Sequence, residues 1–361
     1  MTARLPLLTL SVLSAAAGWA GAGEPVSPLP GSDGTAPAAQ SRWRFGAGYA
    51  PMLGLKTEFS GLGQFHSAFS PQALGGGANY TYDNGFVHVD SSNNLGGKTW
   101  NWGYDASSQY HAAGSGSIDY SLTNSLADGR VSEDSAARQG FECYAYLDMG
   151  AVTLPVLKDL GASWGFRGGI HYARVNADNG NLVAAGVTTL SDSFDLGGTL
   201  PPLAPFSGSF GGPGPLINDA PSRSLATGGQ ALVVGSRALD VDLTTFNLGA
   251  YLEVPLTRKL SVMLEAGFSA AIAAGTYDFN SATSIAGLGT QQSSGHDAST
   301  SVLPGVYVGL DGIYQLNQSW AIQAAARYQY MHDYSLSSNG SSAALSFNSA
   351  FVLSIGVRYS F

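Results

Sequence analysis

Charged side chains, cysteine and long apolar runs are scarce in this sequence. Asp, Glu, Lys and Arg together make up 11% of the 361 residues, and the one cysteine, Cys143, cannot form a disulfide within the chain. No apolar run of ~18 residues follows the amino-terminal region, which excludes transmembrane helices. The net charge of −9, without a basic patch, argues against nucleic acid as a partner.

Glycine and aromatic residues are abundant instead, with 48 Gly, 17 Tyr and 16 Phe. Together with many Ser, Thr and Asn residues they are typical of strands, tight turns and polar loops, so the sequence predicts an all-β fold. Residues 1–22 have the pattern of a signal peptide, with Arg4, an apolar run and small residues near Ala20. Residues 23–41 are expected to form a flexible periplasmic leader, and residues 42–361 the fold itself.

The last strand alternates between apolar and small or polar positions. Its apolar series consists of Phe351, Leu353, Ile355, Val357, Tyr359 and Phe361. Most positions between them are small or polar, and one is Arg358. This period of two is typical of a transmembrane β-strand that has one face toward lipid and the other toward a lumen.

In this feature the chain resembles the outer-membrane β-barrel proteins of Gram-negative bacteria, whose final strand ends in a carboxy-terminal Phe that serves as an assembly signal. The resemblance implies that Phe361, with Tyr359 and Val357, forms that signal. It also implies that outer-membrane lipid and the barrel-assembly machinery are partners, that the protein resides in the cell outer membrane, and that no cofactor is needed.

Three hairpins share one plan: a long strand, a short polar or Pro-bearing turn, and a second long strand. The turns fall at residues 155–159, 255–259 and 317–319, and each return strand keeps its apolar side chains on one parity. Long extracellular loops are expected at 52–98, 177–240 and 280–300. Short turns on one side and long loops on the other are typical of an outer-membrane barrel.

The number of strands depends on which segments join the wall. The strand near Trp43, two strands near 99–104 and 117–122, the three hairpins and the last strand give ten. Trp100, Trp102 and Tyr104 are then expected to face outward as an aromatic girdle. A hairpin at 79–89, with an Asn-Gly turn, is expected in or above the first loop, and would make twelve if it joined the wall. The predicted fold is a closed antiparallel transmembrane β-barrel of about ten strands.

The same parity sends ionisable side chains inward. The predicted lumen-facing residues are Arg44, Asp119, Glu142, Asp148, Arg167, His171, Glu253, Glu265, Asp311, Arg327 and Arg358. We expect ion pairs across the lumen, because an unpaired buried charge is costly. A barrel of about this size has little room beyond its side chains, so an ionic core that fills the bore is favoured over a narrow polar conduit.

These features predict a porin-like or structural barrel with a narrow or filled lumen. The alternative is a surface receptor or adhesin that acts through the long loops on a ligand the sequence does not identify. His332-Asp333 and His296-Asp297 suggest an outer-membrane hydrolase, but strand neighbours point to opposite faces, so we expect no enzyme. The segment Asp90–Gly96 lacks the closing Glu of a calcium loop, so an Asx-rich turn is expected there.

Overall fold

The computed structural model describes residues 42–137 and 139–361, and these form an almost entirely β fold. The predicted signal peptide and leader, residues 1–22 and 23–41, lie outside the described residues. Within the described part, no helix is long and apolar enough to cross a membrane. The helices there are the short α1 (Pro155–Asp159) and the 3-10 helix η1 (Ser107–Gln109), so the predicted all-β class is confirmed.

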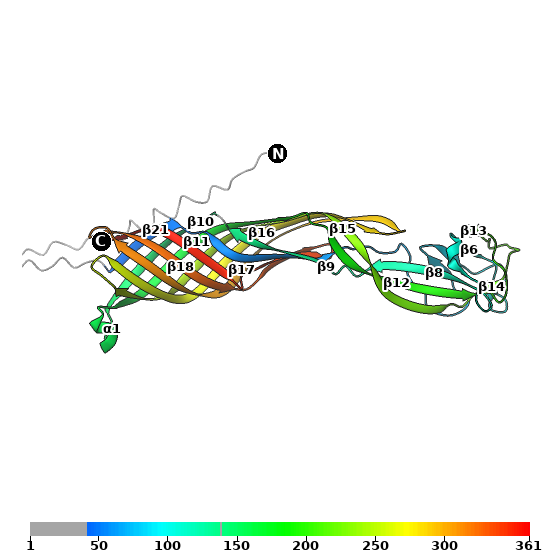
Figure 1. The fold of residues 1–361 in the computed structure, drawn as a ribbon, viewed down its shortest axis with the longest axis horizontal. Helices are drawn as coiled ribbons and strands as arrows, with labels where there is room; N and C mark the ends of the chain where they lie inside the picture. The colour runs from blue at the N-terminus through cyan, green and yellow to red at the C-terminus, as the bar shows by residue number, and fades with distance from the viewer. Residues whose placement is uncertain (1–41, 138) are drawn as a thin grey trace, which may run out of the picture. The chain divides into compact units, whose positions relative to one another are not determined.

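Eight antiparallel strands pair in a ring (Figure 1). Each strand pairs with the next, and the last, β21, pairs back onto the first, β1, from Arg44 opposite Ser360 to Tyr49 opposite Ile355. The eight strands, in ring order, are β1 (Trp43–Tyr49), β10 (Gln139–Ala151), β11 (Ser163–Asn179), β15 (Ser222–Pro255), β16 (Leu260–Ile285), β17 (Gly289–Gln315), β18 (Trp320–Met331) and β21 (Ala350–Ser360).

The three predicted hairpins are present in this ring. They are β10–β11, β15–β16 and β17–β18, each antiparallel and joined by the short connection that the sequence indicated. The first connection contains α1, whose Pro155 stands where a helix tolerates a residue without a free N–H. All three connections lie at one end of the ring, which we call the turn end.

The ring has eight strands, and the predicted counts of ten and twelve were wrong. Segments 99–104 and 117–122 form β5 (Lys98–Thr99), β6 (Trp102–Tyr104) and β8 (Ser117–Ser125), and none of them pairs directly with a ring strand. Of the three, only β8 pairs with β12 (Val183–Asp195), which in turn pairs with β15. Trp102 and Tyr104 are buried, so they are not a lipid-facing girdle. Alternation of aromatic residues is shared by any strand with one buried face, which explains the error.

Two of the predicted long loops are largely strands. Segment 280–300 continues β16 and β17 to a tight turn at residues 286–288, and segment 177–240 contains β12, the short β13 (Phe206–Ser207) and β14 (Ile217–Asn218), and the first half of β15. Segment 52–98 begins with β2 (Met52–Leu62) and contains β3 (Tyr80–Tyr82) and β4 (Gly85–Val87). The last two form the predicted Asn-Gly hairpin, and it lies outside the ring.

Beyond the ring, away from the turn end, β11, β15, β16 and β17 continue as a second stretch of wall. Together with β2, β9 (Gly129–Ala137), β19 (Tyr334–Ser338) and β20 (Ser341–Ser346) they surround an apolar interior. We call these eight segments the upper wall. In it, β2 pairs with β9 on one side and with β20 on the other, and β20 pairs with β19. Pro51 marks the change, because β1 ends before it, and β2 after it keeps β21 only at Met52 and Leu53 and then pairs with β9 and β20.

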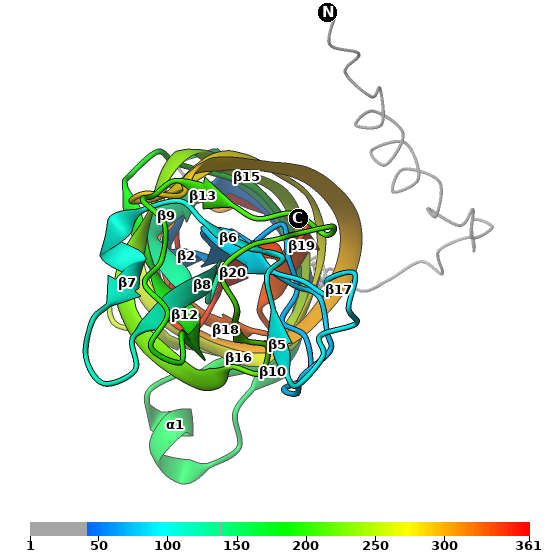
Figure 2. The ribbon, with the colours of Figure 1, turned by 90° about the vertical axis from the view of Figure 1, so that its right-hand side faces the viewer.

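A separate core organises the segments beyond the upper wall, which we call the distal lobe. It comprises β3 to β8, including β7 (Tyr110–His111), with β13, β14 and the end of β12. Figure 2 is viewed from this side. The core is mostly aromatic and consists of Tyr80, Tyr82, Val87, Trp102, Tyr104, Ile118, Tyr120, Leu122, Phe194, Leu196 and Ile217.

The outer face of the ring is apolar and its inner face is polar. Along the last strand Phe351, Leu353, Ile355 and Val357 are exposed, whereas Arg358 is buried, as the parity predicted. Other strands follow the same rule, with Phe166 and Tyr172 on β11 and Ile322 on β18 exposed. This pattern is the inverse of a water-soluble protein and is typical of a barrel whose outer surface contacts lipid.

We expect removal of Phe361 to reduce the amount of assembled barrel in the membrane fraction. Its ring contacts Phe45 and Tyr359 edge-on, with centroids 5.8 Å and 4.9 Å away, so it joins the first and last ring strands. Heat-modifiable migration of the membrane fraction on a gel measures the assembled form. Replacement of the neighbouring Ser360 by Ala is the control and should leave assembly unchanged. Normal assembly without Phe361 would contradict its role as an assembly signal.

Candidate functional site in the lumen and the wall above it

Two arginines and two glutamates form the centre of the lumen. Arg167 on β11 lies 3.0 Å from Glu142 on β10 and 3.2 Å from Glu265 on β16. Arg327 on β18 lies 3.0 Å from Glu142 and 2.5 Å from Glu265. Four ring strands thus send charges to one point, and all four side chains are almost completely buried. Each charge has two opposite partners, which offsets the cost of removing it from water.

A second ionic group lies toward the turn end. Arg44 Nη1 donates to Glu253 Oε2 at 2.7 Å, and Arg44 Nη2 donates to Asp148 Oδ2 at 3.4 Å and to the Tyr251 hydroxyl at 2.5 Å. Arg358 Nη1 reaches the same Glu253 carboxylate at 3.4 Å. This group joins β1, β10, β15 and β21, so it links the first and last ring strands to each other and to β10 and β15.

Aromatic and amide side chains occupy the space between the two ionic groups. Tyr146 is fully buried and accepts a hydrogen bond from Gln323 Nε2 at 2.7 Å, and the same amide donates to Asp311 Oδ1 at 2.8 Å. The guanidinium groups of Arg44, Arg167 and Arg358 lie within 6.0 Å of the Tyr146 ring centroid. Cation–π attraction therefore adds to the ion pairs at this level.

Ten of the eleven predicted lumen residues lie on ring strands, and eight of these form the two ionic groups. His171 is buried above the central group, where its Nε2 lies 2.7 Å from the Ala50 carbonyl oxygen. Asp311 lies between the two ionic groups and accepts its hydrogen bond from the Gln323 amide. The prediction was wrong for Asp119, which lies on β8 in the distal lobe, half-exposed and 3.1 Å from His111. Its neighbours Ile118 and Tyr120 face the lobe core, so Asp119 faces the lobe surface.

An apolar cluster fills the upper wall directly beyond His171. Met52, Leu55 and Phe59 from β2 pack inside it against side chains from β11, β15, β16, β17 and β20. Phe59 is completely buried, and its ring centroid is 6.1 Å from that of Tyr277. This cluster was not predicted, because residues 52–98 were expected to form a loop. The alternation of Met52, Leu55 and Phe59 is broken at Gly54, which has a positive φ. The register of the β2–β9 pairing shifts there, between Met52 and Leu55.

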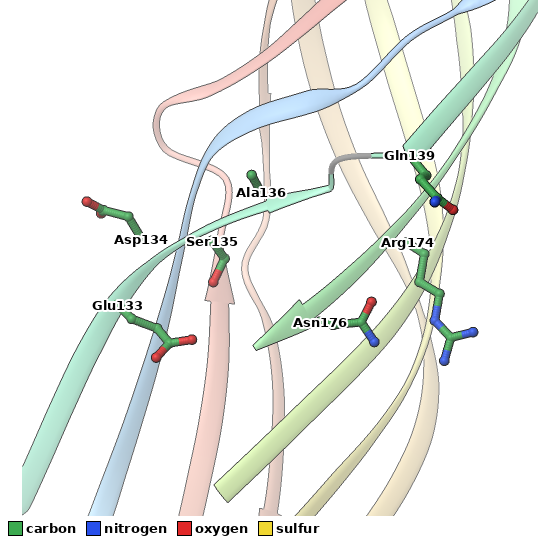
Figure 3. A pocket seen from close by; sticks show the side chains of 7 residues that line it. All are labelled: Glu133, Asp134, Ser135, Ala136, Gln139, Arg174 and Asn176. Atoms are coloured by element: carbon green, nitrogen blue, oxygen red, sulfur yellow. The ribbon is translucent and has the colours of Figure 1, made fainter. Parts of the chain in front are cut away.

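In the upper wall β9 and β11 are neighbours but do not pair with each other by backbone hydrogen bonds. We call the gap in the hydrogen bonding between them the seam. The β10–β11 ladder ends at Gln139 opposite Arg174, and β9 then turns to pair with β2. A cavity of about 420 Å³ lies at this point, with four β9 side chains on one side and Gln139, Arg174 and Asn176 on the other (Figure 3). Asn179 Nδ2 bridges the seam to Glu133 Oε2 at 3.1 Å.

Arg237 lies just inside this seam. It is buried, and its Nη1 donates to Asn179 Oδ1 at 3.3 Å and to the Asn181 carbonyl oxygen at 3.2 Å. Burial lowers the pKa of this guanidinium below its usual value. The amide of Asn179 thus stands between the cation and the carboxylate of Glu133. Arg237 was not predicted as a site residue, since residues 177–240 were expected to form a loop.

An ion pair with a buried carboxylate joins the distal lobe to the upper wall. Arg223 on β15 binds both carboxylate oxygens of Asp192 on β12, at 2.7 Å and 2.6 Å, and the Tyr82 hydroxyl donates to the same carboxylate at 2.6 Å. Burial and the hydrogen bond to Asp192 raise the pKa of Tyr82 well above its usual value. Three segments far apart in the sequence therefore meet at one carboxylate.

The segment 90–96 is an Asx-rich turn, as expected. The Asp90 carboxylate accepts hydrogen bonds from Ser92, Asn94 and Trp100, and both Asn93 and Asn94 have φ near +58°. Burial alone would raise the pKa of Asp90, but these hydrogen bonds outweigh it and lower the pKa. Because protein donors already satisfy the carboxylate, the turn explains these residues without a bound cation.

The histidines considered for catalysis are not gathered at one place. His296 lies 2.7 Å from Asp278 on the neighbouring strand, and both side chains are more than half exposed on the outside of the upper wall. His332 is exposed, whereas its neighbour Asp333 accepts a hydrogen bond from the Phe347 amide at 3.4 Å. Each histidine thus stands apart from the other on the described surface.

Comparison with known proteins finds no matching family model and no matching curated protein. The solved structures that are similar to this chain are outer-membrane β-barrel proteins. The Ail attachment protein of Yersinia pestis, solved with a heparin analogue, is 8% identical, covering 88% of this chain and 99% of that one, with a TM-score of 0.24. The OmpT protease of Escherichia coli is 10% identical, covering 91% and 100%, with a TM-score of 0.31. A FadL homologue of Pseudomonas aeruginosa is 10% identical, covering 88% and 90%, with a TM-score of 0.18.

At these scores the likeness carries no argument about what this chain does. The assignment to a membrane rests on the ring itself, which exposes aromatic and aliphatic side chains outward and buries its charges. Antiparallel rings of this kind are the spanning structures of the outer membrane of Gram-negative bacteria. The predicted location in the outer membrane is confirmed.

Proposed function

We propose that this protein is a non-conducting barrel that anchors an extracellular lobe and acts by contact at the cell surface. The observation that carries the proposal is the buried group of four charges in the lumen, which supports a filled bore. Arg167, Arg327, Glu142 and Glu265 meet at its centre with almost no exposed surface. A ring of eight strands has an interior just wide enough to be filled by side chains.

The apolar cluster of the upper wall supports the same conclusion. An ion that crossed the ionic groups would next meet Met52, Phe59 and Leu239, which are fully buried and offer no hydrogen bonds. Transfer of an ion through such a region is strongly unfavourable because nothing replaces its hydration shell. The lumen therefore has two successive barriers of different chemistry.

The distal lobe supports a role in contact, which is the receptor or adhesin alternative. It has its own aromatic core and is tied to the wall by the Asp192–Arg223 pair, so it is an ordered unit and not a set of loose loops. Binding surfaces are commonly presented by loops on a rigid scaffold. With the turn end toward the periplasm, this lobe stands on the extracellular side. The proposal includes no catalysis.

A liposome swelling assay with a small sugar tests the proposal. Liposomes that contain the purified protein should swell no faster than protein-free liposomes, whereas liposomes with an open porin provide the positive control. The full chain is used, because the proposal concerns the barrel with its lobe, and a variant without residues 67–125 and 187–221 would lack the lobe. Sugar entry well above the protein-free rate would overturn the proposal.

A further inference from the structure

The distal lobe exposes several large apolar side chains on neighbouring loops. Leu95, Leu200, Leu203 and Phe210 are 81%, 80%, 93% and 61% exposed. The loop of Leu95 lies beside Phe210, because the Phe210 carbonyl oxygen accepts hydrogen bonds from the Ser91 amide at 2.9 Å and from Trp100 Nε1 at 3.2 Å. Leu200 and Leu203 precede Phe210 in the same segment, residues 196–216. We call these four side chains the apolar tip.

The backbone beneath the apolar tip is held firmly. The Tyr104 hydroxyl donates to the Pro202 carbonyl oxygen at 2.5 Å, Trp102 Nε1 donates to the Pro215 carbonyl oxygen at 2.8 Å, and the Gly208 amide donates to the Trp102 carbonyl oxygen at 2.8 Å. The lobe core thus fixes the main chain of residues 196–216 while the leucine and phenylalanine side chains point away from it. A partner would not have to order this loop on binding.

The apolar tip also lacks charge, although the protein as a whole has a net charge of −9. Residues 196–216 and 91–97 contain no Asp, Glu, Lys, Arg or His. The exposed Lys98 and Asp195 border these two segments, but their opposite charges attract each other, so the region carries no net charge. A surface without net charge is complementary to a partner surface of the same kind. It offers no attraction to anionic lipid, which basic residues would provide.

The chemistry of the apolar tip fits a lipid bilayer better than a protein surface. Protein interfaces depend on a contiguous patch with Tyr, Trp and Arg at its centre, whereas Trp102 and most tyrosines of this lobe are inside its core. Trp100 is half-buried beside the tip, with its indole N–H bound to the Phe210 carbonyl oxygen. The tip offers separate aliphatic and phenyl side chains on a Gly- and Pro-rich backbone. A fluid bilayer can surround each such side chain independently, which a rigid protein surface cannot do.

The position of the lobe indicates that the bilayer is not its own. Along β15, Ser222 precedes Asp242 by 20 residues, and Asp242 lies where the outer face of the wall becomes polar. At ~3.3 Å per residue this stretch reaches on the order of 60 Å. We propose that the apolar tip inserts into the outer leaflet of an opposing, zwitterionic membrane, and so docks the cell onto another membrane. The inference rests on the proposed function, because it names the partner of the same lobe.

Vesicle docking tests this inference. The full-length protein is placed in nanodiscs that are immobilised through their scaffold, and fluorescent phosphatidylcholine vesicles are added at low and high salt, with empty nanodiscs as background. The wild type should retain vesicles well above background at both salt concentrations. The triple substitution Leu200→Ser, Leu203→Ser and Phe210→Ser should reduce the number of retained vesicles to a tenth of the wild-type number or less. Leu182→Ser, at a side chain 62% exposed outside the tip, is the matched control and should retain vesicles normally.

Protease resistance of the lobe shows whether the triple variant is folded, and Leu203→Ser alone provides a milder change at the most exposed position. Wild-type protein that does not retain these vesicles would overturn the inference, as would undiminished retention by the triple variant. Retention that requires anionic lipid and is lost at high salt would also overturn it. If vesicles do not dock but the liposomes of the swelling assay exclude sugar, only the docking inference fails and the proposed function stands. Sugar entry would refute the proposed function whatever the docking result.

Discussion

Replacement of Arg167 by alanine is expected to lower the free energy of unfolding by ~3–5 kcal/mol, because it leaves buried carboxylates with too little compensating charge. In the wild type Glu142 and Glu265 each contact both Arg167 and Arg327. Without Arg167 the two carboxylates share one guanidinium in a site closed to water. Urea unfolding of the purified barrel measures the change.

Arg174→Ala is the matched control for this substitution. Arg174 lies on the same strand, is exposed, and has its Nε 4.0 Å from Asp242 Oδ1. An exposed pair of this kind contributes at most ~1 kcal/mol, so the control should have little effect. Equal stability of the two variants would mean that water reaches Arg167 and screens its charge, contrary to a filled lumen.

Replacement of Phe59 by alanine should also destabilise the protein by ~3–5 kcal/mol, because it removes a large buried ring and leaves a cavity. Phe59 has no exposed surface and packs against Tyr277 in the upper wall. Urea unfolding again provides the measurement, with the exposed Leu182→Ala as control. A loss as small as that of the control would show that the apolar cluster is loosely packed and is not a barrier.

Strand parity was predictable because alternation is a local property of the sequence. Phe351, Leu353 and Ile355 face outward and Arg358 inward since successive side chains on a strand point to opposite faces. The three hairpins were predicted for the same reason, and so was the inward direction of Arg167 and Arg327. Which acid each arginine meets depends on how the ring brings strands together, and this information is not local.

The strand count and the upper wall could not be predicted from alternation alone. Beyond the membrane the outer face is in water, so residues such as Thr290, Gln291 and Ser294 of β17 lack the apolar series that marked the membrane strands. They were therefore assigned to a loop. Conversely, Trp102 and Tyr104 alternate like membrane residues although they fill the core of the distal lobe. The outer half of β17 was thus taken for a loop, and the strand of Trp102 and Tyr104 was taken for a membrane strand. The second error arose because burial against protein and exposure to lipid select the same side chains.

Single-channel recording in a planar bilayer is the most direct test of the claim that the lumen is closed, because ions need a narrower path than any sugar. The purified wild-type protein, inserted in its native orientation, should add no steady conductance to that of the bare bilayer. The filled ionic centre and the apolar cluster beyond it both require this result. A stable, weakly selective open conductance in the wild type would contradict the account.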